Sequence, residues 1–187
     1  MMRRLLALLG LCGLGGCALL PSPAEMNARP AQVEAASFAM NGRISINHDG
    51  ERHSAGLHWT HRVQTDEILL LNPLGQTAAR VYRDANTATL DDGNKHYQAD
   101  SAEALMEEVL DWHLPLRGLH QWVLGRPDND SRAQITRDSS GRISELQQDG
   151  WDVHYLRYAG SLPARLQLSR EHLTLLLLID QWQWNPH

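Results

Sequence analysis

Cysteine and phenylalanine are scarce in this chain: its 187 residues include two cysteines and one phenylalanine. Long apolar runs are also missing. Neither residues 5–14 nor residues 173–179 approach the roughly 20 residues that a helix needs to cross a bilayer. Acidic residues outnumber basic ones, 22 to 17, and no basic run occurs. Such a chain is a poor candidate for binding nucleic acid. We therefore expect neither a membrane-spanning helix nor a nucleic-acid partner.

The N-terminus has the layout of a secretory signal. Two arginines precede a short apolar run, and small residues follow it. The sequence Leu14-Gly15-Gly16-Cys17 resembles the box of bacterial lipoproteins, in which the cysteine thiol receives diacylglycerol before cleavage and acylation of the new amine. This resemblance implies that residues 1–16 are a signal peptide and that Cys17 carries the lipid. The alternative is an ordinary secretory signal with an incidental cysteine.

Removal of residues 1–16 changes the charge and cysteine content. The mature chain has 15 basic and 22 acidic residues, a net charge of -7, so attachment to a membrane should depend on its acyl chains. Two or more such chains anchor a protein stably. Ala18, and not an aspartate, follows the lipid site. By resemblance to the sorting rule of enteric bacteria, this favours the outer membrane. Because the lipid occupies Cys17, the mature chain can form no disulfide, and packing must supply its stability.

The mature chain divides into a tether and one domain. Residues 17–37 contain three prolines among small and polar residues, a composition typical of a tether. From Phe38, apolar and polar residues alternate, which predicts a half-buried strand. For residues 38–187 we expect mainly β structure with short helices. The spacing of the strands favours an antiparallel sheet that curls into a sandwich or barrel. The eleven expected strands are 38–47, 54–61, 67–71, 78–83, 87–90, 95–98, 133–137, 142–147, 152–158, 164–169 and 173–182.

Two short helices are expected to interrupt the strands. Asp100 and Glu103 can form a capping box for the first, which has an apolar face at helical spacing. Pro115 can open the second helix, and Gly125 ends it. Facing a curled sheet, these helices either complete a solid core or leave a lined cavity that binds an apolar ligand. The residue pattern leaves both outcomes open.

Candidate catalytic chemistry is sparse. Histidines at positions 48, 53, 58 and 61 suggest a metal site, but His58 and His61 should point to opposite faces of a strand. Asp66 and Glu67 lie across a turn from them, so solvated strand histidines are the favoured interpretation. The sequence contains no nucleophile elbow or glycine-rich phosphate loop within the domain, and no nucleophile beside an orienting base. We expect no enzyme, no metal site and no cofactor.

A series of motifs extends along the domain. In chain order they are Phe38-x-x-x-Gly42-Arg43-Ile44-Ser45, Trp59-x-His61, Leu70-Leu71-Asn72-Pro73-Leu74-Gly75-Gln76-Thr77, Leu114-Pro115-Leu116, Leu119-x-x-Trp122-Val123-x-Gly125-x-Pro127, Gln148-x-Gly150-Trp151-x-Val153-x-Tyr155 and Leu162-Pro163. In this order and spacing, from Cys17 to Trp182, the chain resembles the LolB family of outer-membrane lipoprotein receptors. No single motif is decisive, and the resemblance depends on the ordered series.

The resemblance implies a fold and a function. The fold is an unclosed antiparallel half-barrel of eleven strands with helices covering its open side. The function is to accept lipoproteins from the periplasmic carrier LolA in an apolar cavity and to insert them into the inner leaflet of the outer membrane. The implied partners are a LolA-type carrier, triacylated lipoprotein cargo and outer-membrane lipid, and we expect a monomer on the periplasmic face. The alternatives are a lipid-anchored structural or assembly protein with a solid core, and a lipid-anchored hydrolase.

Two sets of residues are the candidate sites. Pro73 and Gly75 should end a strand and leave Leu74 at a loop tip. The family carries a protruding loop with an apolar tip here, implicated in delivering lipoproteins to the membrane. Burying one leucine in lipid contributes about 1.5–3 kcal/mol, enough to orient a protein but not to anchor it. The expected cavity-lining residues are Met40, Ile44, Trp59, Leu69 and Leu71 on the strands, with Leu105, Met106 and Trp122 in a helical lid.

Overall fold

The computed structural model describes residues 37–110 and 116–186. The predicted signal peptide, 1–16, and the lipid site at Cys17 lie outside these residues. The same holds for the tether, 17–37, apart from Ser37.

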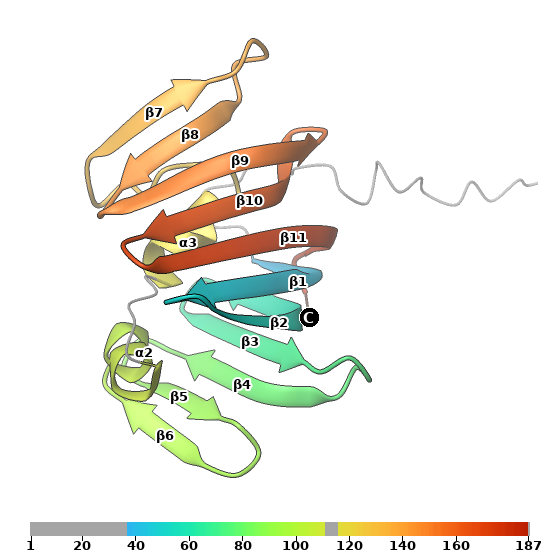
Figure 1. Cartoon of the computed structure of the whole chain (residues 1–187), viewed down its shortest axis with the longest axis vertical. Helices are drawn as coiled ribbons and strands as arrows, with labels where there is room; N and C mark the ends of the chain where they lie inside the picture. The colour runs from blue at the N-terminus through green and yellow to red at the C-terminus, as the bar shows by residue number, and fades with distance from the viewer. Residues whose placement is uncertain (1–36, 111–115, 187) are drawn as a thin grey trace, which may run out of the picture.

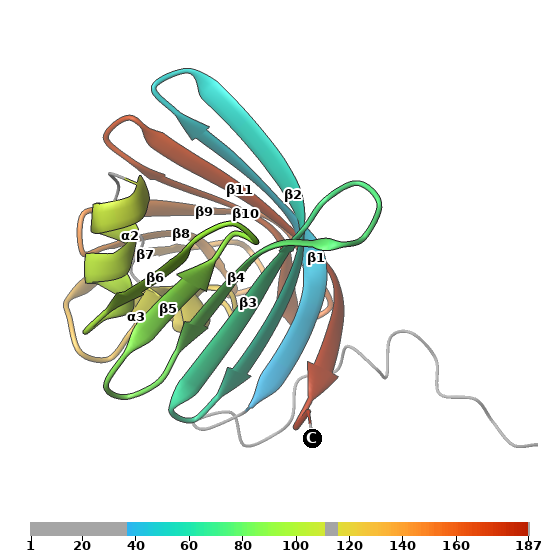
Figure 2. The ribbon, with the colours of Figure 1, turned by 90° about the horizontal axis from the view of Figure 1, so that it is seen from below.

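The strands of the described residues form one curled antiparallel sheet (Figures 1 and 2). In chain order they are β1 (Phe38–His48), β2 (Glu51–Arg62), β3 (Thr65–Leu71), β4 (Thr77–Arg83), β5 (Ala88–Asp91), β6 (His96–Ala99), β7 (Ala133–Arg137), β8 (Ile143–Gln148), β9 (Trp151–Ala159), β10 (Leu162–Arg170) and β11 (Leu173–Trp184). Their order across the sheet is β6-β5-β4-β3-β2-β1-β11-β10-β9-β8-β7, so β6 and β7 are the edges and the sheet is unclosed. The predicted mainly β class and the unclosed sheet of eleven strands are confirmed.

Strands β1 and β11 join two meanders at the middle of the sheet. Their ladder shifts register between Asn41 and Gly42. A Cβ atom on Gly42 would overlap the carbonyl oxygen of Leu178, so the close approach of the two backbones requires glycine here. At the end of the ladder, the backbone N–H of Asn185 donates to the carbonyl oxygen of Ser37 at 2.9 Å. The first and last strands of the domain are therefore direct neighbours.

Two short helices, α2 (Ala102–Leu110) and α3 (Leu116–Trp122), follow β6 along the chain. Ser101 caps α2 in place of the expected Asp100, because its hydroxyl accepts the backbone N–H of Ala104 at 3.1 Å. Helix α2 packs against β5 and β6. Helix α3 lies on the concave side of the sheet (Figure 2), where Leu119 and Trp122 are buried. The concave side, between the sheet and α3, is where the candidate site forms.

Candidate functional site

An apolar cavity of about 90 Å³ lies between the concave face of the sheet and α3. Strands from both meanders and one residue of α3 contribute to its wall. Every lining residue is apolar: Met40, Ile44, Ile46, Leu57, Trp59, Ile68, Leu70, Val81, Leu90, Leu119, Leu168, Leu175 and Leu177. A wall of this kind favours an apolar ligand, because it would leave any polar group of the ligand without a hydrogen-bond partner.

The strand residues predicted to line a cavity fall into two groups. Met40, Ile44 and Trp59 lie in its wall. Leu69 and Leu71 do not, and the prediction for these two residues is wrong. Leu71 instead borders a shallow groove on the other face of the sheet, and Leu69 shares its parity, since alternate residues of a strand point the same way.

The error arises from the register of the hairpin between β2 and β3. A two-residue turn joins these strands, so Arg62 pairs with Thr65 and Trp59 pairs with Ile68. Ile68 and Leu70 therefore share the inward face of Trp59, and both line the cavity. All residues from Ile68 to the end of β3 are apolar, so periodicity could not identify the inward parity of this strand.

The three predicted lid residues occupy different environments. Leu105 is fully buried in α2 and does not line the cavity. Met106 lies in α2, but its side chain is outside the described part of the structure. Trp122 is fully buried at the C-terminal end of α3. Leu119, one turn earlier, is the residue that α3 contributes to the cavity wall.

The C-terminal end of α3 is fixed to the sheet by hydrogen bonds. The indole N–H of Trp122 donates to Oε1 of Gln148 at 2.9 Å, and the backbone N–H of Asp128 donates to the same oxygen at 2.9 Å. The hydroxyl of Tyr155 donates to the carbonyl oxygen of Trp122 at 2.9 Å. Burial raises the pKa of Tyr155, so its hydroxyl stays neutral. These contacts hold α3 at Trp122 while Leu119 faces the cavity.

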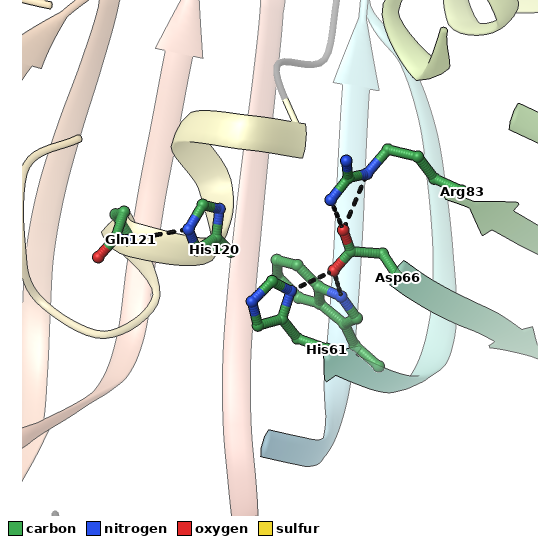
Figure 3. Close-up of polar contacts among 6 residues, drawn as sticks. His61, Asp66, Arg83, His120 and Gln121 are labelled. Atoms are coloured by element: carbon green, nitrogen blue, oxygen red, sulfur yellow. Dashed lines mark hydrogen bonds and ion pairs between the residues drawn. The ribbon is translucent and has the colours of Figure 1, made fainter. Parts of the chain in front are cut away.

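A buried polar cluster adjoins the cavity wall at Trp59 (Figure 3). Its centre is Asp66, which is 1% exposed. Oδ1 of Asp66 accepts the Trp59 indole N–H at 2.8 Å and lies 2.7 Å from Nδ1 of His61. Oδ2 accepts Nε–H of Arg83 at 2.9 Å. Burial raises the pKa of Asp66, but hydrogen bonds and charge from His61 and Arg83 outweigh it and lower the pKa below its ordinary value.

Helix α3 meets this cluster through His120. The rings of His120 and His61 are stacked, with centroids 4.8 Å apart and planes inclined by 13° (Figure 3). The ring of Phe38 lies 5.1 Å from His61. Residues from β1, β2, β3, β4 and α3 therefore converge beside the cavity, and the stacked pair joins the helix to the sheet.

This cluster was not predicted from the sequence, because the expected strands end at His61 and begin at Glu67 and so leave Asp66 in the turn. The two-residue hairpin turn instead makes His61 and Asp66 direct cross-strand partners, and recognising that turn length would have paired them. His58 is in a different environment, with its Nδ1 2.6 Å from Oδ1 of Asn41. Among the described residues, no group of three or more His, Cys, Asp or Glu is arranged to hold a metal ion.

The loop between β3 and β4 presents an apolar tip. Leu74 is 83% exposed. The side-chain oxygen of Asn72 accepts the backbone N–H groups of Leu74 at 2.9 Å and Gln76 at 3.0 Å, and Gly75 adopts a φ of +78°. The loop is therefore a hydrogen-bonded turn that holds Leu74 outwards, and Pro73 beside it is also exposed. None of the described helices has the length and apolar character of a membrane span.

Comparison with known proteins identifies relatives along almost the whole chain. The model of the family described as "Outer membrane lipoprotein LolB" matches residues 36–182. A protein of Chromobacterium violaceum named outer-membrane lipoprotein LolB is 36% identical, over 98% of this chain and 100% of its own. A protein of the same name from Pseudomonas aeruginosa is 36% identical, over 97% of this chain and 96% of its own.

A solved structure supports the fold. The crystal structure of a LolA superfamily protein from Nitrosomonas europaea superimposes with a TM-score of 0.52 at 10% identity, covering 88% of this chain and 91% of that one. At this identity the likeness concerns the fold alone.

Proposed function

The chain belongs to the LolB family, and we propose that it is an outer-membrane lipoprotein that receives other lipoproteins and inserts them into that membrane. The donor is a LolA-type periplasmic carrier, the cargo is a triacylated lipoprotein, and the acceptor is the inner leaflet of the outer membrane. The names of the relatives support the location and the family role. On this proposal the protein works as a monomer without a cofactor and is not an enzyme.

The observation that carries the proposal is the wholly apolar cavity on the concave face of the sheet. Each exposed methylene group of an acyl chain costs about 0.8 kcal/mol in water, so acyl chains need continuous cover between carrier and membrane. A receptor that binds them more tightly than the carrier and less tightly than the bilayer passes them on without ATP, because ligands move according to differences in affinity. An apolar wall is sufficient for this task.

Acyl chains require more room than the present cavity offers. A volume of about 90 Å³ is smaller than the cavity of roughly 150 Å³ that holds one benzene molecule, and an acyl chain is larger than benzene. We propose that the two helices cover the open side and shift when a chain enters. Leu119 is the first helical residue that such a chain would displace. The proposed contacts of the chains are Met40, Ile44 and Trp59 together with the other lining residues, and Met106 of α2.

The remaining parts of the chain complete the proposal. Residues 1–16 act as the signal peptide, Cys17 carries the lipid, and residues 17–37 tether the domain 38–187 to the outer membrane on its periplasmic side. The tether leaves the domain free to turn towards both the carrier and the bilayer. The exposed Leu74, held outwards by Asn72, enters the bilayer and orients the cavity towards it.

A transfer assay tests the proposal. The acceptor is the full chain with the substitution Cys17→Ala, which removes the lipid site. A lipoprotein bound to the purified carrier is mixed with this acceptor. The two proteins are then separated, and the cargo bound to each is measured. The expected result is that most of the cargo moves to the Cys17→Ala protein without ATP. Cargo that stays on the carrier, together with no binding of a fluorescent fatty acid by the Cys17→Ala protein, would contradict the proposal and favour an assembly protein with a solid core.

A further inference from the structure

We propose that the convex face of the sheet, opposite the cavity, docks on phospholipid head groups through an arginine row formed by Arg43, Arg165 and Arg157. The proposal rests on the proposed function, because it assigns the surface that faces the bilayer when Leu74 enters it. The partner is identified by its chemistry. Lipid phosphates bind arginine guanidinium groups, and the acyl chains below them accept apolar side chains.

The register of the sheet aligns the arginine row. Leu178 of β11 pairs with Arg43 of β1 on one side and with Arg165 of β10 on the other. Arg165 in turn pairs with Arg157 of β9. Because Leu177 lines the cavity on the concave face, its neighbour Leu178 and the partners of Leu178 point to the convex face. All three arginines are exposed, so three cations lie side by side across four neighbouring strands.

The charges around the arginine row leave it positive. Arg43 donates to Oδ1 of Asp180 at 3.4 Å, and both side chains stay largely exposed. Glu145, on the same face, lies 3.7 Å from a histidine of β9. Within the part of the chain that the structure describes, Arg157 and Arg165 have no acidic partner. Like charges directly opposite each other in a sheet repel, so an anion bound between these two arginines would be favourable.

Apolar residues border the arginine row at both ends. Arg43 and Leu178 line the shallow groove of the convex face together with Pro73 of the loop between β3 and β4, and Figure 2 shows this loop projecting from the sheet. At the other end, Leu156 precedes Arg157 at a register shift of β9 and is 51% exposed. Exposed apolar side chains beside arginines fit a lipid surface, where phosphates lie above acyl chains, better than they fit an acidic protein.

The arginine row orients the domain and does not anchor it. Each arginine near an anionic membrane surface strengthens binding about fivefold, which is too little to hold a chain whose mature net charge is -7. A single loop tip in the bilayer leaves the domain free to rotate about that tip. The row extends to β9, five strands from β3 and so about 24 Å away along the sheet. A second contact at this distance fixes the rotation.

The test measures binding of the full chain with Cys17→Ala to vesicles of phosphatidylcholine alone and of phosphatidylcholine mixed equally with phosphatidylglycerol. This parent should bind the mixed vesicles more tightly, and added salt should weaken that binding. The variant adds Arg157→Gln and Arg165→Gln, and its affinity for the mixed vesicles should fall about 25-fold, fivefold for each arginine. The control adds Arg52→Gln and Arg137→Gln, which remove the same charge from exposed positions outside the row, and it should keep most of the affinity.

Acceptance of cargo from the purified carrier separates this proposal from the proposed function. The Arg157→Gln, Arg165→Gln protein should accept a lipoprotein as well as the parent does. Equal binding of the parent to both kinds of vesicle, or a variant that binds the mixed vesicles like the parent, would overturn the docking surface. A variant that keeps vesicle binding but accepts less cargo would assign the row to the carrier. A parent that accepts no cargo would contradict the proposed function, while its vesicle binding still decides the docking surface.

Discussion

Helix α3 separates two regions of the molecule that are filled differently. On one side Leu119 meets a cavity of about 90 Å³ with an apolar wall. On the other side the buried Trp122 packs near Trp151, with ring centroids 6.3 Å apart, and bonds to Gln148. Both regions use large apolar residues of one continuous sheet. The two regions therefore differ in how closely their side chains pack, because both are built from the same residue types.

The unfilled region lowers the stability of the fold. At about 24 cal/mol per Å³ of cavity, filling the volume of about 90 Å³ would stabilise the fold by at most about 2 kcal/mol, compared with the roughly 5–15 kcal/mol that stabilises a typical domain. The filled region contributes the packing that offsets this cost, and it fixes one end of α3. On the proposed function, the cavity binds acyl chains while the packed side keeps the helix in place.

The largest effect should come from emptying the filled region. Trp122→Ala is expected to lower the free energy of unfolding by about 3–5 kcal/mol, because it removes a fully buried indole and creates a new void. Urea denaturation followed by circular dichroism measures the change. Leu119→Ala, at the edge of the existing cavity, is the matched control and should cost nearer 2 kcal/mol. Equal losses of free energy for Trp122→Ala and Leu119→Ala would show that the filled region and the cavity wall are packed equally well.

Removing the buried charge beside the cavity should have the next largest effect. Asp66→Asn is expected to lower the free energy of unfolding at neutral pH by roughly 3 kcal/mol, because Arg83 keeps a buried charge without a carboxylate partner. Asp91→Asn is the control: that carboxylate is exposed and pairs with His96 at 2.7 Å, so the loss should stay below about 1 kcal/mol.

The parent protein and the Asp66→Asn protein should also differ in how the free energy of unfolding depends on pH. The folded state holds the pKa of Asp66 below its ordinary value of 3.8, so the unfolded state binds more protons as acid is added. The stabilisation from Asp66 is therefore complete above the unfolded pKa and is lost as pH falls through the folded pKa. Denaturation at neutral pH and below about pH 4 should show the gap between parent and Asp66→Asn narrowing in acid. A difference in the free energy of unfolding that stays constant with pH would contradict the lowered pKa of Asp66.

A smaller effect on the free energy of unfolding is expected from enlarging one side chain in the cavity wall and one side chain outside it. Leu166 and Leu177 are cross-strand partners on β10 and β11, both buried, but Leu177 alone lines the cavity. Leu166→Phe should cost about 1–3 kcal/mol by overpacking. Leu177→Phe can extend into the void, so its cost should stay below about 1 kcal/mol, while the affinity for a fluorescent fatty acid falls. Similar costs for both substitutions would show that the cavity is not available space.

The smallest effect on stability should come from the exposed loop tip. Leu74→Glu and its control Val63→Glu change residues that are 83% and 70% exposed in turns at opposite ends of β3, and each should shift the free energy of unfolding by less than about 0.5 kcal/mol. In a liposome assay, both proteins should accept cargo, and only Leu74→Glu should fail to insert it. Normal insertion of cargo by the Leu74→Glu protein would show that the apolar tip of the loop has no role in insertion.

The residue pattern predicted much of the sheet because each strand begins and ends at local signals. The alternation after Phe38 and the turn at Pro73 and Gly75 correspond to the start of β1 and to the loop between β3 and β4. The inward face of β3 could not be predicted in the same way, because Leu69 and Leu70 are both leucine and only the hairpin register distinguishes them. The stack of His61 on His120 joins distant elements, and no local spacing encodes it.

The pairing of β1 with β11 constrains how the domain assembles. Each meander can form hairpin by hairpin from neighbouring residues, but the ladder between them connects the first strand of the domain to the last. Closing a loop that spans nearly the whole domain carries a large entropy cost, and contacts between such distant residues form slowly. We therefore expect the middle of the sheet to be completed last, and we expect a truncation within β11 to disrupt the centre of the sheet before its edges.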